Sequence, residues 1–231
     1  MITLSVDKGV SFTKAVLWDK RKIIKYLFNQ ALPKADKIIR VTPKIEFGSL
    51  AKGGLYLSGL KSAIVVSCGT GTAVVWARKN KPVVHLGGTG VGGGTLQGLG
   101  KLILKTDSVE KIFELAKKGK RIKVDLTVGD ILGTGIGLLG PETTAANFGK
   151  LKSSKKADLA QALVNMVGEV IGMTACLAAG KTAEKKIVFC GMVATNKLMQ
   201  KYISGVCQMF QLEAIFPKKG EFATAIGAGI K

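Results

Sequence analysis

The feature of this sequence that most constrains its fold is a pattern of short β-rich segments that occurs twice. The first set is Ile2–Val6, Ala15–Trp18 and Ile23–Phe28, and the second set is Ala63–Ser67, Ala73–Ala77 and Pro82–Leu86. In both sets a turn rich in glycine, serine and threonine joins the first segment to the second. A three-stranded meander that occurs twice indicates an internal duplication, and it predicts two similar lobes on either side of a cleft. We expect residues 1–61 to form the N-terminal lobe and residues 62–231 the C-terminal lobe.

Helical segments are expected between and after the two meanders. A helix that begins at Pro43 and continues to about Leu57 separates them. Further helices are predicted over 93–104, 108–119, 156–179, 197–210 and from about 221, and further strands over 37–41, 186–190 and 213–216. In the longest helix, apolar residues recur every three to four positions from Leu159 to Met173. This order of strands and helices is typical of the α/β class.

The charge of the chain predicts anionic ligands. The 231 residues include 35 lysines and arginines against 15 aspartates and glutamates, a formal net charge of +20. The basic residues run along the whole chain, so they favour phosphorylated metabolites, nucleic acid or acidic membranes. Only 6% of the residues are aromatic, and the sequence has neither zinc-finger spacing nor an RNA-recognition aromatic motif. We therefore expect small-molecule ligands, with no nucleic-acid and no membrane partner.

Cysteine and histidine are too scarce for metal or thiol chemistry. Four cysteines lie far apart without a C-x-x-C pair, and the chain holds one histidine. A zinc site or a cysteine–histidine pair therefore has too few members, and the cysteines are typical of small buried residues in a reducing compartment. The longest apolar stretch, Met166–Gly180, is shorter than a membrane span and contains Glu169. We expect a soluble cytoplasmic protein without a signal peptide.

Two glycine-rich segments have the composition of phosphate-binding loops. They are Cys68–Thr72 and Gly87–Thr95, and each follows a predicted strand. Glycine lets backbone N–H groups approach a phosphate closely, although the same residues also suit a tight turn without a ligand. From Phe47 to Thr106 the chain has no aspartate or glutamate. Because carboxylates repel an anion at short range, this depletion favours phosphate binding.

The few acidic residues upstream of these loops are candidates for chemistry. They are Asp7, Asp19, Asp36 and Glu46, and Asp19 and Asp36 lie in polar turns where solvation explains them. Asp7 ends the first strand, where it can hold Mg²⁺ beside a phosphate or form an Asx turn that closes the hairpin. Glu46 lies early in its helix, where it can act as a general base or simply stabilise the helix dipole.

Several motifs, in order along the chain, resemble the type II pantothenate kinases. They are Asp7-x-Gly9-x-Ser11-x-x-Lys14, Ile45-Glu46-Phe47, Gly69–Thr72, Gly87–Gly100, Thr143–Gly149 and Gly220–Ala228. The long glycine run and the Ala-Asn-Phe-Gly segment are specific, whereas the first turn alone is not. The resemblance implies the fold of actin, sugar kinases and heat-shock ATPases, in which two ribonuclease-H-like lobes enclose an ATP cleft.

The resemblance also implies an activity and a set of roles. The activity is ATP-dependent phosphorylation of the primary hydroxyl of pantothenate, the first step of coenzyme A synthesis. Glu46 would be the catalytic base, and Asp7 would organise Mg²⁺. The nucleotide would contact Gly9, Ser11, Lys14, Gly69, Thr70, Gly71, Thr72, Gly92, Gly93, Gly191 and Asn196, and the acceptor would contact His85, Gly88, Thr89 and Gly90. The long helix would contribute to a homodimer.

Three departures from the family pattern keep alternatives open. The first turn has Val10 and Ser11 where the family has Gly and Thr, and His85 stands where the family has an arginine. A helix is missing over Asn29–Asp36, so the first lobe is short. Valine adopts a positive φ only with strain, and imidazole lacks the fixed cationic fork of guanidinium. The alternatives are another small-molecule kinase of the same superfamily, a catalytically silent nucleotide-binding protein and, with least support, a nucleic-acid binder.

Overall fold

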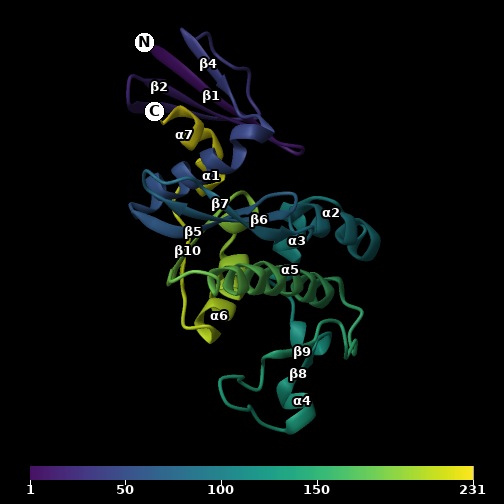
Figure 1. The fold of residues 1–231 in the computed structure, drawn as a ribbon. Coiled ribbons are helices and arrows are strands. Elements are labelled where there is room, and N and C mark those ends of the chain that lie inside the picture. Colours follow the sequence, from purple (N-terminus) through teal and green to yellow (C-terminus); the bar gives the residue numbers. More distant parts are fainter. Residues whose placement is uncertain (231) are drawn as a thin grey trace.

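Two β-sheets with closely related strand orders form the two halves of the molecule in the computed structural model, which describes residues 1–230 (Figure 1). Lys231, the last residue of the expected second lobe, lies outside the described residues. The first sheet has the order β3-β2-β1-β4 and the second the order β11-β10-β5-β6-β7. In each sheet the first strand of a meander pairs on its other side with a parallel strand, β1 with β4 and β5 with β10. The predicted duplication and the α/β class are therefore confirmed.

The strands occupy nearly the predicted positions. In the first sheet they are β1 (Ile2–Lys8), β2 (Thr13–Asp19), β3 (Lys22–Phe28) and β4 (Lys37–Arg40). In the second sheet they are β5 (Ser62–Cys68), β6 (Thr72–Arg78), β7 (Val84–Thr89), β10 (Lys186–Cys190) and β11 (Glu213–Ile215). The run Ala63–Val66 in β5 is completely buried. Its apolar residues do not alternate with polar ones because helices cover both faces of this central strand.

Two helices, α1 (Pro43–Ser58) and α7 (Ala223–Gly229), lie between the sheets (Figure 1). Helix α1 follows the first sheet in the chain but packs on the second, with Leu50 against the cluster that contains Val65. Helix α7 ends the chain but packs on the first sheet, where Ile226 joins the cluster that contains Val16 and Trp18. The two ends of the chain thus meet at the first sheet.

The other face of the second sheet is covered by helices. They are α2 (Gly93–Leu99), which continues as a π-helix over Gly100–Leu104, α3 (Val109–Ala116), α5 (Lys156–Ala179) and α6 (Lys197–Met209). Helix α5 is long and apolar enough to cross a membrane by length and composition, with a mean hydropathy of 1.6 over its most apolar window. However, 67% of that window is buried inside the fold, as is typical of the core helix of a folded domain.

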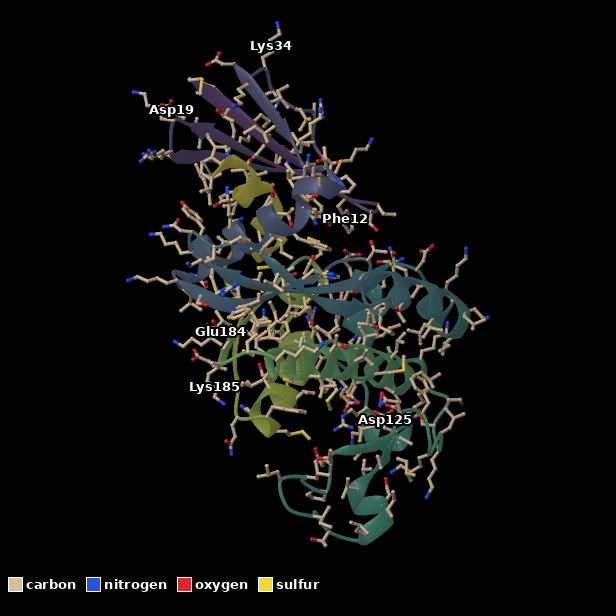
Figure 2. The ribbon with its side chains drawn as sticks, in the orientation of Figure 1. Phe12, Asp19, Lys34, Asp125, Glu184 and Lys185 are labelled. Atoms are coloured by element: carbon tan, nitrogen blue, oxygen red, sulfur yellow. The ribbon has the colours of Figure 1, made fainter. Side chains whose placement is uncertain are left out.

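A small element that the sequence did not predict projects beyond α5 (Figure 1). It consists of β8 (Leu126–Thr127), α4 (Val128–Leu132) and β9 (Thr144–Ala146), and three short 3-10 helices occur elsewhere, at Arg121–Lys123, Val193–Thr195 and Gly220–Phe222. Asp125 lies at the base of the element in Figure 2 and accepts hydrogen bonds from the Phe148 amide (3.0 Å) and the Asn165 side chain (3.2 Å). Burial raises the pKa of Asp125, and these hydrogen bonds and the guanidinium of Arg121 oppose that rise.

Candidate active site

A cavity of about 880 Å³ lies where the first sheet, α1 and the second sheet meet. A cavity of this size accommodates a nucleotide or a comparable ligand. It is lined by most of the residues that the sequence singled out: Asp7, Gly9, Ser11, Lys14, Glu46, Gly69, Thr70, Gly71, Thr72, Thr89, Gly93, Gly191 and Asn196. Four others, His85, Gly88, Gly90 and Gly92, lie outside this lining. The fold thus places thirteen predicted residues from both ends of the chain around one space, although their roles remain predictions.

The two predicted phosphate turns meet across the cavity. The hydroxyl oxygens of Ser11 and Thr70 lie 3.4 Å apart, within hydrogen-bonding distance. Within residues 1–230, the amides of Thr70 and Gly71 donate to no other group, so they are free to bind an anion. Hydroxyls and unpaired amides that converge from two loops form a suitable site for phosphate oxygens.

The first turn forms without a left-handed residue. The Gly9 amide donates to the Phe12 carbonyl oxygen over 3.0 Å, and no residue from Gly9 to Phe12 has a positive φ. Val10 is therefore unstrained, and its side chain is 93% exposed at the tip. The ring of Phe12 packs against Phe28, with the ring centroids 5.1 Å apart. Figure 2 shows Phe12 at the end of the first sheet that faces the second lobe. The turn thus accommodates Val10 without requiring a positive φ at that position.

The long glycine run at residues 87–95 holds the second phosphate turn at residues 69–72 in place by hydrogen bonds. The amides of Gly93 and Gly94 donate to the carbonyl oxygens of Gly69 and Thr70 over 2.8 and 2.9 Å. The Thr72 hydroxyl donates to the Val91 carbonyl oxygen over 2.8 Å. Because these amides are already paired, the run acts mainly on the shape of the turn at residues 69–72, which in turn presents its own free amides to the cavity.

Asp7 stands beside Lys14 at the edge of the cavity. The two residues are direct partners across β1 and β2. Burial raises the pKa of Asp7, and the positive charge of Lys14 lowers it by a smaller amount. No group in the described chain donates a hydrogen bond to the Asp7 carboxylate, so the Asx-turn interpretation has no support. The carboxylate faces the cavity as an ionisable group without a partner of its own.

The surroundings of Asp7 fit a hydrated Mg²⁺ ion better than a protein-caged metal. Residues 1–230 contain no group of three or more His, Cys, Asp or Glu side chains that could hold a metal. Mg²⁺ keeps several water ligands and needs only one or two carboxylates when phosphates supply the rest. A single partly desolvated carboxylate beside a phosphate turn meets that requirement.

We expect the Asp7→Asn variant to be more stable than the parent without ligand at neutral pH. A carboxylate whose pKa is raised in the folded state costs no stability below its ordinary value of 3.8, and the cost grows as the pH rises through the folded-state pKa. Removing the charge should raise the melting temperature at pH 7 by about 1–3 °C, and the gain should shrink as the pH approaches 3.8. Thermal unfolding of the ligand-free protein measures this. A lower melting temperature at pH 7 would mean that Asp7 stabilises the hairpin.

Glu46 occupies the first turn of α1 and borders the same cavity. The helix begins there because Pro43 occupies one of its first two positions, and it ends at Gly59, whose φ is +72°. The Glu46 side chain is exposed and forms no salt bridge or hydrogen bond within the described residues. Its carboxylate therefore has acceptor capacity available for a ligand. Its position also suits the dipole of α1, so both interpretations of this residue fit the structure.

His85 lies next to this helix rather than in the cavity lining. A β-bulge in β7 pairs Val74 with Gly87 and Val75 with His85. A bulge of this kind redirects the side chain of the strand. The imidazole stacks on Phe47, with ring centroids 4.4 Å apart and an angle of 12° between the planes. Phe47 follows Glu46 directly, so His85 is one stacked ring away from the candidate base.

The turn after β10 also meets the cavity. Gly191 has a φ of +98°, and a Cβ atom there would lie 2.4 Å from the Cys68 carbonyl oxygen, so this position requires glycine. The Asn196 side-chain oxygen accepts hydrogen bonds from the Leu198 and Met199 amides and thereby caps α6. Only its amide nitrogen remains available to a ligand.

One wall of the cavity was not predicted from the sequence. It includes Gln97, Val109, Glu110, Phe113, Glu114 and Lys117. Glu221 and Thr224 also line the cavity and were not predicted. The sequence predicted a helix over 108–119 but contained no signal that one of its faces would border the cleft. Only the packing of α3 against α5 places that face there.

Comparisons with known proteins match this chain to one family of relatives. The family model described as Fumble matches residues 59–231. A type II pantothenate kinase of Bacillus cereus strain G9842 is 33% identical, with 87% of this chain and 76% of the relative covered. The one of Oceanobacillus iheyensis is 34% identical, with 79% and 72% covered. A third, from Bacillus cereus strain ATCC 14579, is 28% identical over 98% of this chain and 97% of its own.

Solved structures share the fold at low sequence identity. The activator of the 2-hydroxyisocaproyl-CoA dehydratase from Clostridium difficile, with bound ADPNP, has a TM-score of 0.61 at 14% identity, with 99% of this chain and 92% of that chain covered. A ROK family glucokinase from Streptomyces griseus, in complex with glucose and AMPPNP, has a TM-score of 0.63 at 12% identity, with 99% and 98% covered. The family model and the two relatives above 30% identity together show that this chain belongs to the type II pantothenate kinase family.

Proposed function

We propose that this protein transfers the γ-phosphoryl group of ATP to the primary hydroxyl of pantothenate, the first step of coenzyme A synthesis. The observation that carries the proposal is the convergence of Glu46, Asp7 and the two phosphate turns on one cavity. Family membership supplies the acceptor, because the relatives carry the name pantothenate kinase. Phosphoryl transfer asks a protein mainly for positioning and for neutralisation of charge, and the cavity offers groups for both.

In the proposed reaction each group of this chain has one task. The free amides of Thr70 and Gly71 and the hydroxyls of Ser11 and Thr70 bind the phosphate oxygens, so that the γ-phosphorus faces the acceptor. The Glu46 carboxylate takes the proton from the acceptor hydroxyl while that oxygen bonds to phosphorus and the bond to the ADP oxygen breaks. Lys14 adds positive charge near the phosphates. Closure of the two lobes excludes water, which would compete as an acceptor.

Asp7 would hold Mg²⁺, through water or directly, next to the bound phosphates. When bound, the ion neutralises charge on the β- and γ-phosphate oxygens. The raised pKa of Asp7 supports this assignment, since a cation beside a desolvated carboxylate recovers the cost of its burial.

The acceptor side of the site is proposed to include the β7 edge. Gly88, Thr89 and Gly90 follow His85 there, and Thr89 reaches the cavity. His85 provides a stacked aromatic surface where the family carries an arginine, so it lacks the planar donor fork of guanidinium. We also propose a homodimer that involves α5, in line with the family, and a cytoplasmic location, which the four buried free cysteines support. Sedimentation velocity measures the assembly state.

An ATP-consumption assay with a panel of acceptors tests the proposed function. Pantothenate should stimulate ADP formation at least tenfold over the rate with buffer alone, and glucose or glycerol at the same concentration should not. The product should carry one phosphate by mass spectrometry. Stimulation by a sugar but not by pantothenate would favour the alternative small-molecule kinase. Binding of ATP without turnover on any acceptor would favour a silent nucleotide-binding protein.

A further inference from the structure

Helix α3 presents one complete face to the large cavity. The lining residues Val109, Glu110, Phe113, Glu114 and Lys117 are spaced by three and four positions, so they lie on one side of the helix. The helix is fixed in place because Ser108 caps its N-terminus, where the Ser108 hydroxyl accepts from the Lys111 amide over 3.3 Å, and because Ile112 is fully buried in the core. This face is therefore a preformed wall rather than a mobile segment.

The chemistry of this wall suits a nucleoside and not a phosphate. Val109 is half-buried and Phe113 is 6% exposed, so they offer an apolar surface at the edge of the core. Glu110 and Glu114 flank that surface, and their carboxylates repel phosphate oxygens. Although Lys117 adds one positive charge to this wall, the acid-free turn at 69–72 with its free amides is the better place for the phosphates. The nucleoside part of the same nucleotide, an apolar base with polar edges and a ribose with two hydroxyls, then lies next to α3.

The two glutamates of the wall are not equivalent. The Glu110 carboxylate already accepts a hydrogen bond from the Ser108 hydroxyl over 3.1 Å. The Glu114 carboxylate forms no hydrogen bond and no salt bridge with any residue from 1 to 230. A carboxylate accepts hydrogen bonds but donates none when it is ionised. Of these two glutamates, only Glu114 therefore has its full acceptor capacity available to a donor group of the ligand.

Two other residues of the cavity lining, Val193 and Asn196, have complementary character. Val193 supplies apolar surface, and Asn196 can offer only its N–H₂ group because its oxygen caps α6. A nucleoside that contacts both Asn196 and α3 meets a donor from Asn196 and an acceptor from the Glu114 carboxylate. Adenosine has both kinds of partner, since its ring nitrogens accept and its 6-amino and ribose hydroxyl groups donate.

We infer that Glu114 determines which nucleotide the enzyme uses, by accepting a hydrogen bond from an N–H or O–H donor of the nucleoside. That donor is the 6-amino group of adenine or the 2′-hydroxyl of the ribose. The inference rests on the proposed function, in which ATP is the phosphoryl donor, and it deepens that function by naming the residue that reads the nucleoside.

Nucleotide binding without an acceptor tests the inference by titration calorimetry with Mg²⁺ present. The ligands are ATP, 2′-deoxy-ATP, and ITP, in which oxygen replaces the 6-amino group. Hydrogen bonds to a charged acceptor are among the stronger ones, so Glu114→Ala should weaken ATP binding about tenfold. Glu114→Ala should not change the affinity for the analogue that lacks the group donating to Glu114. The analogue with unchanged affinity therefore identifies the donor. Asp107→Ala is the matched control, since it removes the same charge two residues before α3 from an exposed residue outside the cavity lining.

Two results would overturn the inference. The first is an ATP affinity of Glu114→Ala equal to that of Asp107→Ala. The second is an equal loss of affinity for ATP and both analogues, which would indicate a general effect of charge. Because no acceptor is present, a protein that binds ATP but does not phosphorylate pantothenate still tests Glu114. A parent protein that binds no ATP would overturn both the inference and the proposed function.

Discussion

Replacing Glu46 by glutamine should lower kcat for pantothenate phosphorylation by a factor of about 10² to 10⁴. The amide keeps the size of the side chain but cannot take the proton of the acceptor hydroxyl. The affinity for ATP should stay within about twofold of the parent, because the phosphate turns at residues 9–12 and 69–72 remain in place. Steady-state kinetics with pantothenate, together with nucleotide titration, separates the two quantities.

The fold should tolerate this change. The Glu46 side chain is exposed and has no partner within residues 1–230, so its removal costs only the interaction with the helix dipole, about 0.5 kcal/mol. Glu213→Gln is a suitable control, because that glutamate is exposed on β11, outside the cavity. Parental turnover in Glu46→Gln would remove this residue from the reaction and leave only its role at the helix terminus.

The second large effect is expected on stability, at the contact between α1 and α7. A Cβ atom on Gly53 would lie 1.8 Å from the carbonyl oxygen of Ala223, which belongs to the backbone of α7 and cannot move alone. Gly53→Ala should therefore lower the free energy of unfolding by about 3 kcal/mol, the magnitude typical of overpacking at a fixed backbone contact. Guanidinium unfolding monitored by tryptophan fluorescence measures this change.

Gly48→Ala in the same helix provides the matched control. A Cβ atom on Gly48 meets nothing within 4 Å, so alanine there should raise stability by about 0.5–1 kcal/mol through its higher helix propensity. Opposite signs for the two substitutions would locate the effect at the helix contact. Equal changes would mean that α1 and α7 do not approach as closely as the structure places them.

The helix contact matters for function because it connects the two lobes. Helix α1 carries Glu46 at its start and packs on the second sheet, while α7 packs on the first sheet. Thr224 of α7 also borders the cavity. A shift of either helix therefore moves the candidate base relative to the phosphate turns. We therefore expect the Gly53→Ala protein that remains folded to show a lower kcat than the parent protein.

Much of the architecture was predictable because its signals are local. The two meanders were found from β-rich runs between polar turns, and β10 and α5 from their apolar patterns. The prediction failed for β8, α4 and β9, which have two, five and three residues. Elements this short contain less than two periods of any pattern, and they persist because Asp125 and Asn165 hold their base to α5. The division at residue 61 stays a prediction.

The candidate site likewise contains residues that could be predicted from the sequence and residues that could not. Glycine, threonine and isolated acidic residues are conspicuous in the sequence, so Asp7, Glu46 and the turn at residues 69–72 could be named in advance. The stacking of His85 on Phe47, the capping role of Asn196 and the lining by Glu114 could not. Each of these depends on contacts between elements that lie far apart in the chain.

The sequence by itself determined the longer strands and helices, the duplication and the family, because these follow from periodicity and from motifs within short windows. Only the tertiary structure decided that the last helix packs on the first sheet, that α1 packs on the second sheet, and that the face of α3 forms a wall of the cleft. The physical reason is that an amphipathic helix specifies which face it buries but not against what. That choice is made by the shape and volume of surfaces that meet only when the whole chain has folded.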